Sequence, residues 1–204
     1  GTIRISAEES ATATVLGPAL AKLLPDYPDI KVEIGVDNGL IDIVAQGFDA
    51  GVRSGDIVAK DMIAAPIGPP LRFVVVGSPD YFERHGRPKH PRDLTRLPCI
   101  NVRLPTRGGL YAWEFEKGGR EVKVRVDGQL IFNTLEPSHA AALNGLGLAF
   151  LPERRVAADI LAGRLEQVLD DWCPPYAGYH LYYPSRRQPT AAFTVLLEAL
   201  RWRG

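Results

Sequence analysis

The start of the chain carries two hydrophobic periods, one after the other. Ile3 and Ile5 alternate with polar residues over 2–6, which predicts a strand that is buried on one face. Apolar residues then recur at helical spacing over 15–24, and Pro25 predicts the end of that helix. The chain is therefore expected to open with a strand that is followed by an amphipathic helix.

A similar order of elements comes next. Residues 31–36 alternate again and predict a second strand, 40–47 predict a short helix, and 48–53 predict a third strand. Strands that alternate with helices pair in parallel through crossover connections. We therefore expect these three strands to form one parallel sheet.

The middle of the chain has a different pattern of hydrophobic and polar residues. The unbroken apolar run at 73–76 predicts a central strand that is covered on both faces. Residues 112–116 and 122–126 alternate on either side of Gly118 and Gly119, which predicts a β-hairpin whose turn uses positive φ angles. The remaining patterns predict strands at 99–103, 146–151 and 179–183 and helices at 140–144, 156–161 and 192–200.

This order predicts an α/β fold of two lobes. A first lobe is interrupted by a long insertion with its own sheet, and the chain returns to it through crossovers near 70–73 and 175–179. Two small lobes joined twice are expected to enclose a central cleft. Clefts at the carboxyl ends of parallel strands are where such sheets bind ligands.

Charge and hydropathy reduce the number of possible functions. Among 204 residues, Lys plus Arg and Asp plus Glu number 24 each, so the basic patch that grips nucleic acid is not expected. No apolar run has the roughly 20 residues of a membrane span. The chain opens directly on a strand rather than a signal peptide, and it begins with Gly1 rather than Met, which predicts a fragment or a processed chain. We expect a cytoplasmic protein.

Catalytic and cofactor motifs are weak. Gly145-Leu146-Gly147 lies after a helix and before a strand, the reverse of a phosphate-binding loop. Ser54 lacks the glycine two residues earlier that a nucleophile elbow needs, and the four histidines show no metal-ligand spacing. Cys99 and Cys173 have no Cys-x-x-Cys spacing and are expected to be reduced thiols. We expect no enzyme, no cofactor and no metal.

Polar residues instead gather where the first strands end. Ser10 opens the first helix, Asn38 follows the second strand, and Arg53 and Ser54 follow the third. The carboxyl ends of parallel strands meet at one edge, so these residues are expected to converge on one crevice. Capping of the first helix is an equally good interpretation of Ser10.

Several blocks of this sequence resemble the effector-binding domain of LysR-type transcriptional regulators. They span nearly the whole chain in the right order: GTIRISA (1–7) with Ser10, LGPAL (16–20), LPDYPDIKV (24–32), IDIVAQGFDAGVR (41–53), AAALNGLGLAFLP (140–152), LAGRL (161–165) and YYPSRR (182–187).

The resemblance implies a fold similar to type 2 periplasmic binding proteins, with subdomain I at 1–72 and 177–204 and subdomain II at 73–176. It also implies a small-molecule effector, a homodimer or homotetramer formed through the first helix and second strand, and DNA binding through an N-terminal winged helix-turn-helix that this chain lacks. By resemblance, effector contacts are expected at eight residues: Ser10, Asn38, Arg53, Ser54, Asn101, Arg103, Asn133 and Thr134.

One departure bears on the effector. Glu8 and Glu9 precede Ser10, where the family often has Pro and an uncharged residue. Two carboxylates facing the cleft would repel an anion unless Arg53 or Arg103 offsets them. The family's usual carboxylate effector, an amine-bearing effector and a neutral one all stay open. The rival functions are a periplasmic solute-binding protein of the same fold and, less favoured, a small-molecule enzyme.

Overall fold

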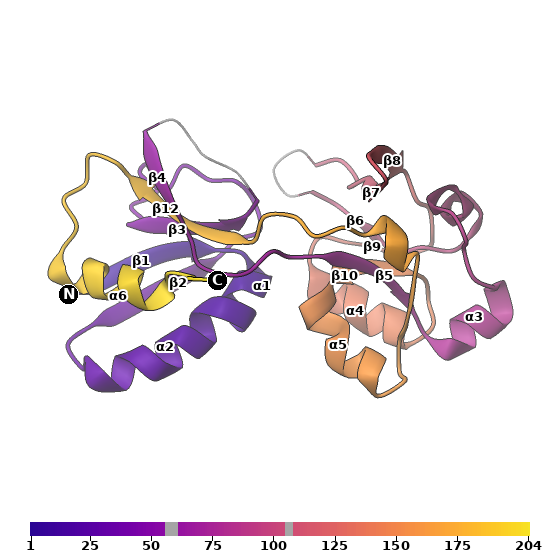
Figure 1. Ribbon diagram of the computed structural model, residues 1–204, viewed down its shortest axis with the longest axis horizontal. Helices are drawn as coiled ribbons and strands as arrows, with labels where there is room; N and C mark the ends of the chain where they lie inside the picture. The colour runs from indigo at the N-terminus through magenta and orange to yellow at the C-terminus, as the bar shows by residue number, and fades with distance from the viewer. Residues whose placement is uncertain (56–60, 105–107) are drawn as a thin grey trace. The chain divides into compact units, whose positions relative to one another are not determined.

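The computed structural model describes residues 1–55, 61–104 and 108–204. The chain divides into two compact units, unit 1 (Gly1–Leu71 with Tyr176–Gly204) and unit 2 (Arg72–Pro175). Each unit has its own sheets, which the ribbon in Figure 1 shows. Each unit also has its own hydrophobic core.

The strands of unit 1 are β1 (Thr2–Ala7), β2 (Lys31–Val36), β3 (Ala50–Ser54), β4 (Met62–Pro66) and β12 (Tyr179–Pro184). Its helical segments are α1 (Glu9–Ala11), the π-helical turn η1 (Thr12–Leu16), α2 (Gly17–Leu23), the 3-10 turn η2 (Leu24–Asp26) and α6 (Ala191–Leu200).

The strands of unit 2 are β5 (Phe73–Gly77), β6 (Asn101–Val102), β7 (Trp113–Lys117), β8 (Arg120–Val124), β9 (Ile131–Phe132), β10 (Ala149–Pro152) and β11 (Glu166–Val168). Its helical segments are α3 (Pro79–His85), η3 (Pro91–Arg96), α4 (Leu135–Leu143), α5 (Glu153–Leu161) and η4 (Asp170–Trp172).

Unit 1 is built on a five-stranded sheet in the order β2-β1-β3-β12-β4. β1 pairs in parallel with both β2 and β3, which confirms the predicted parallel pairing of the first three strands. β12 runs antiparallel to β3 and β4. The carboxyl ends of β1, β2 and β3 therefore share one edge of the sheet with the start of β12.

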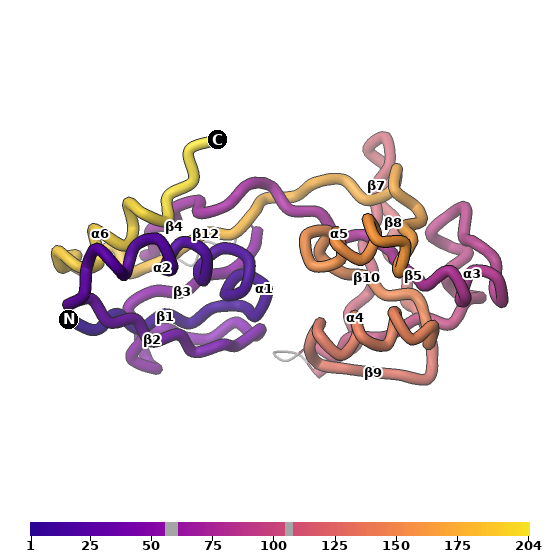
Figure 2. Tube along the Cα trace, turned by 90° about the horizontal axis from the view of Figure 1, so that it is seen from below, coloured from indigo at the N-terminus to yellow at the C-terminus, as the bar shows by residue number. Residues whose placement is uncertain are grey.

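The core of unit 1 lies between this sheet and the helices. Ile5 of β1 and Val52 of β3 are completely buried with Leu196 of α6. Helices α2 and α6 contact each other, and their traces run side by side in Figure 2. Each large aliphatic side chain buried in this way contributes about 1.5–3 kcal/mol of transfer free energy, so the packing fixes where the strand ends lie.

The helix after β1 contains an irregular turn that the periodicity did not predict. The chain is helical from α1 through η2, but five residues, Thr12–Leu16, form a π-helical turn between α1 and α2. The hydroxyl groups of Thr12 and Thr14 donate to the carbonyl oxygens four residues earlier, at Glu8 and Ser10. A π turn re-aims the side chains on either side of it and is frequent at functional sites.

The short helix predicted at 40–47 is wrong. Residues 43–47 form turns, in which Gln46 N–H donates to Asp42 O and Phe48 N–H donates to Ile43 O. Ile43 is buried, whereas Leu40 and Val44 are more than half exposed. One buried anchor in this segment holds the loop but does not supply the apolar stripe that stabilises a helix.

Unit 2 is organised around β5, which lies between β10 and β11 and runs antiparallel to both. Val75 of β5 and Phe150 of β10 pack with Trp113 and Phe115 of the β7–β8 hairpin. The alternate residues of β5 and β10 pack with α4 and α5, and Figure 1 shows the hairpin and these helices on opposite sides of β5 and β10. This confirms that the apolar run 73–76 is covered on both faces.

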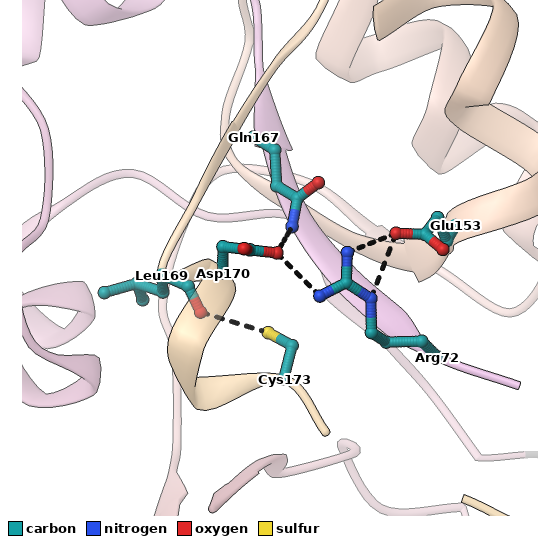
Figure 3. Close-up of polar contacts among 6 residues, drawn as sticks. All are labelled: Arg72, Glu153, Gln167, Leu169, Asp170 and Cys173. Carbon is teal, nitrogen blue, oxygen red and sulfur yellow. Dashed lines mark hydrogen bonds and ion pairs between the residues drawn. The ribbon is translucent and has the colours of Figure 1, made fainter. Parts of the chain in front are cut away.

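The first residue of unit 2 is firmly anchored. Figure 3 shows the Arg72 guanidinium between the carboxylates of Glu153 and Asp170; its Nε lies 3.0 Å from Glu153 Oε2 and its Nη1 2.6 Å from Asp170 Oδ1. Gln167 Nε2 also donates to Asp170 Oδ1, at 2.6 Å. On the unit 1 side, Leu71 and Tyr176 pair through two backbone hydrogen bonds of 2.7 and 2.8 Å. The chain therefore crosses from unit 1 to unit 2 at Leu71 and Arg72, and hydrogen bonds hold each of these residues within its own unit.

Within the described residues, every helix is too short or too polar to cross a membrane.

Candidate functional site

The polar residues of unit 1 gather at the carboxyl ends of its parallel strands. Glu8 directly follows β1, Asn38 comes two residues after β2, and Ser54 is the last residue of β3. β1 lies between β2 and β3 in the sheet, so the structure brings these three residues to the same edge.

Glu8 and Ser54 are joined directly. The Ser54 N–H donates to Glu8 Oε1 at 3.2 Å, and the Ser54 hydroxyl donates to the same oxygen at 3.5 Å. Burial raises the pKa of the Glu8 carboxyl, while the Ser54 N–H and the positive charge of Arg53 act in the opposite direction. Glu8 is therefore a partly desolvated acceptor at the centre of this edge.

Ser10 is the most unusual group at this edge. It lies in the first helical turn and is only 6% exposed, and its Oγ is completely buried without a hydrogen-bond partner among the described residues. Capping does not explain it, because the α1 N-cap is Glu8 and its side chain makes no cap hydrogen bond. A buried hydroxyl without a partner costs about 1–3 kcal/mol, which makes Ser10 the best-defined candidate for ligand contact.

Asn38 supplies the capping interaction instead. Its Oδ1 accepts from the Glu9 N–H at 2.9 Å, which satisfies one of the free donors at the helix start. The preceding Asp37 accepts from the Gly39 N–H at 2.8 Å. The loop after β2 is therefore shaped by its own side chains, and Asn38 connects that loop to the helix.

Arg53 plays a different part from the one expected. It is only 2% exposed, and its guanidinium makes five hydrogen bonds within the protein. Four of these five reach Gly39 O and the carbonyl and hydroxyl oxygens of Ser6, at 2.7–3.1 Å. A guanidinium has five N–H groups, so none is left for a ligand. Arg53 holds the loop after β2 against β1 and acts as a positioning residue.

Tyr182 of β12 also belongs to this edge, and sequence reasoning missed it. A Cβ built on Gly51 would lie 2.2 Å from the Tyr182 ring, so the ring lies directly against the β3 backbone. Burial raises the pKa of the Tyr182 hydroxyl, and the charges of Arg53 and Glu8 are close enough to act on it. The signal was a glycine inside a strand pattern, which marks a close approach.

The four residues expected in unit 2 lie around the parallel pair β6–β9. Asn101 is buried, and its Nδ2 donates to Val126 O at 3.1 Å. Arg103 is exposed; its N–H donates to Phe132 O and its side chain donates to Gly108 O. Asn133 is exposed and Thr134 is the N-cap of α4, without a side-chain cap hydrogen bond. The structure thus brings Arg103 close to Asn133 and Thr134, while Asn101 serves the fold.

In the described part of the chain, no group of three or more His, Cys, Asp or Glu side chains is suited to a metal ion. Cys99 and Cys173 are both free and buried.

We expect both thiols to be unreactive in the native protein. Burial raises the pKa of Cys99 to about 12 and that of Cys173 to about 11, and the thiolate is the reactive form. Ellman's reagent at pH 8 should therefore titrate no thiol until urea is added, and then both. Reaction of either thiol within minutes in buffer would contradict this expectation.

Comparison with known proteins gives the family. The family model for the LysR substrate binding domain matches residues 1–203. A putative transcriptional regulator of Pseudomonas aeruginosa PAO1 is 55% identical over 202 residues, covering 99% of this chain and 66% of its own length. The HTH-type transcriptional regulator PgrR of Escherichia coli K12 is 45% identical over 204 residues, covering 100% and 68%. The chain thus spans about two thirds of the length of these relatives.

Solved structures show the same fold. The regulatory domain of AphB from Vibrio vulnificus has a TM-score of 0.83 at 23% identity, and the CrgA regulatory domain from Neisseria meningitidis has a TM-score of 0.76 at 22% identity. Each comparison covers 98% of both chains. The fold is therefore that of the type 2 periplasmic-binding-protein-like regulatory domains.

These findings define the class of protein as a regulatory, effector-binding domain of transcriptional regulators. The chain belongs to the LysR substrate-binding domain family.

Proposed function

We propose that unit 1 binds a small-molecule effector at the carboxyl ends of β1, β2 and β3, through Ser10, Ser54 and Glu8. In this proposal the domain captures the effector without transforming it. Asn38 and Arg53 contribute indirectly, because they hold the helix start and the loop after β2. Arg103, Asn133 and Thr134 are the candidate contacts that unit 2 offers.

The observation that supports this function best is the Ser10 hydroxyl. It is buried at the start of a helix, it has no hydrogen-bond partner among the described residues, and a π turn begins two residues later. Buried polar groups in proteins are nearly always paired, and an exception calls for a ligand, a water molecule or a functional role. An effector that bonds to Ser10 would remove this penalty.

Membership of this family supports a proposal for the complete protein. We propose that this domain works in the cytoplasm as part of a longer, homodimeric or homotetrameric regulator that binds DNA through an N-terminal helix-turn-helix. The balanced charge of the chain supports the proposal that DNA is bound by another part of the protein. With 24 basic and 24 acidic residues, this domain has no excess of positive charge for phosphate contacts. The effector would act by binding one conformation of the regulator more tightly than another.

A thermal-shift screen of small acids, amines and neutral metabolites tests the proposal. We expect some of these compounds to raise the melting temperature of the chain, because a ligand that binds only the folded state stabilises it by mass action. In Ser10→Ala the affinity measured by calorimetry should fall about fivefold or more, since one hydrogen bond to the ligand is lost.

The matched control is Ser185→Ala. Ser185 is exposed and follows β12, at the opposite edge of the sheet, because β12 runs antiparallel to β3. This variant should bind with unchanged affinity. Equal affinities in Ser10→Ala, Ser54→Ala and the wild type would refute the site, and turnover of the compound would favour an enzyme.

A further inference from the structure

We infer that the proposed site of unit 1 receives a cationic nitrogen of the effector, an ammonium or amidinium group, with the Glu8 carboxylate as its acceptor. This inference rests on the proposed function and adds the chemical class of the ligand. Three observations support it: the negative charge at this edge of the sheet, the use of all Arg53 N–H groups within the protein, and the acceptor positions of Glu8 and Ser10 that remain available.

The charge at this edge is negative. Among the described residues, three carboxylates (Glu8, Glu9 and Asp37) lie within two residues of the carboxyl ends of β1 and β2, against the single guanidinium of Arg53. An anionic group placed here would be repelled by these carboxylates, whereas a cation would be attracted.

Arg53 does not supply a binding group for a carboxylate. An arginine recognises a carboxylate by directing two parallel N–H groups at it. All five N–H groups of Arg53 are already used within the protein, mainly by Ser6 and Gly39. Freeing two of them would leave buried oxygens without donors, at about 1–3 kcal/mol each. The positive charge of Arg53 therefore offsets part of the negative charge of Glu8, but its guanidinium has no free N–H groups with which to bind an anion.

Glu8 still has capacity to accept hydrogen bonds. Its side-chain hydrogen bonds with described residues are both made by Oε1 to Ser54, and an ionised carboxylate has about four acceptor positions. Burial raises the pKa of Glu8 and so disfavours its charged form. A cation beside the carboxylate favours the charged form and offsets part of this desolvation cost. The unpartnered, buried Ser10 hydroxyl lies two residues away and provides a second acceptor for an N–H group.

Matched probes test the ligand class on the chain of residues 1–204. Two sets share a carbon skeleton: benzylamine, benzoate and benzyl alcohol, and 1,4-diaminobutane, succinate and 1,4-butanediol. At fixed pH and ionic strength, we expect the amines to raise the melting temperature and the carboxylates to leave it unchanged. Raising the salt concentration should weaken the effect of the amines only modestly, since a partly buried charge pair is screened less than an exposed one.

Variants connect the effect with Glu8. In Glu8→Gln, calorimetric affinity for the amines should fall about tenfold or more, because a charge-assisted hydrogen bond becomes a neutral one. Glu8→Asp keeps the charge and should lose less affinity. Glu83→Gln, which makes the same charge change at an exposed position of α3 in unit 2, should bind as the wild type does. Far-UV circular dichroism checks that each variant is folded.

The outcomes separate this inference from the proposed function. Stabilisation by benzoate or succinate that disappears in Ser10→Ala would retain the site and overturn the ligand class. Amine binding that is equal in Glu8→Gln and the wild type would overturn the role of Glu8. Failure of both amines to stabilise the chain would also overturn the inference, while the wider metabolite screen would still decide the proposed function.

Discussion

Arg53→Met is expected to lower the free energy of unfolding by about 3–5 kcal/mol, because several buried oxygens lose their hydrogen-bond donors at about 1–3 kcal/mol each. The substitution deletes five hydrogen bonds and leaves Gly39 O and two oxygens of Ser6 buried without their donor. The loop after β2 should loosen, so amide hydrogen exchange at Gly39 should become faster. Urea unfolding followed by circular dichroism measures the overall effect.

The control for this substitution is Arg154→Met. Arg154 is exposed on α5, and removal of its charge should change the free energy of unfolding by no more than about 0.5 kcal/mol. Equal unfolding midpoints for the Arg53 and Arg154 variants would show that the buried network contributes nothing to stability. Because Arg53 positions the loop that carries Asn38, the Arg53 variant should also lose effector affinity.

Gly178→Ala is expected to cost about 3 kcal/mol, at the upper end of what overpacking usually costs. A Cβ at this position would lie 2.0 Å from the carbonyl oxygen of Pro69 and 3.0 Å from that of Gly68. Both contacts are with backbone, which cannot rotate away as a side chain would. The segment that contains Gly178 and the segment that contains Gly68 and Pro69 would have to move apart.

That separation would reach the site. The N–H of Gly55, next to Ser54, donates to the carbonyl oxygens of Ala177 and Gly178 at 3.1 and 3.2 Å. We therefore expect Gly178→Ala to lower both the urea midpoint and effector affinity. Gly109→Ala is the control, since a Cβ there meets nothing within 4 Å and the backbone φ is not positive. A Gly178 variant as stable as the Gly109 variant would mean that the two segments separate at little cost.

The location of the site gives the irregular features of unit 1 a common explanation. The π turn follows β1, Arg53 bonds to Ser6 of β1, and Tyr182 lies against Gly51, which pairs with Ser6. Local irregularity that is held in place by surrounding packing is typical of sites that are organised before the ligand arrives.

The sequence by itself determined the elements that carry a clear hydrophobic pattern or turn signal of their own. Alternation at 2–6 and 31–36 predicted β1 and β2, the apolar run at 73–76 predicted a strand covered on both faces, and Gly118-Gly119 predicted the hairpin turn, where φ is +56° and +79°. These patterns are readable because each element must present one face or both to a core, and glycine alone adopts positive φ without strain. The expectation that Ser10, Asn38, Arg53 and Ser54 lie at one edge of the sheet came from the predicted parallel pairing.

Only the tertiary structure decided which of these residues are free to bind. Arg53 bonds to Ser6 and Gly39, 47 and 14 residues away, and Asn38 bonds to the backbone 29 residues before it. Strands β4 and β11 also went unpredicted, because they are short and are stabilised by pairing with β12 and β5 rather than by their own periodicity. Hydrogen bonds between distant segments leave no period in the sequence, so whether a polar side chain is occupied or available depends on the folded chain.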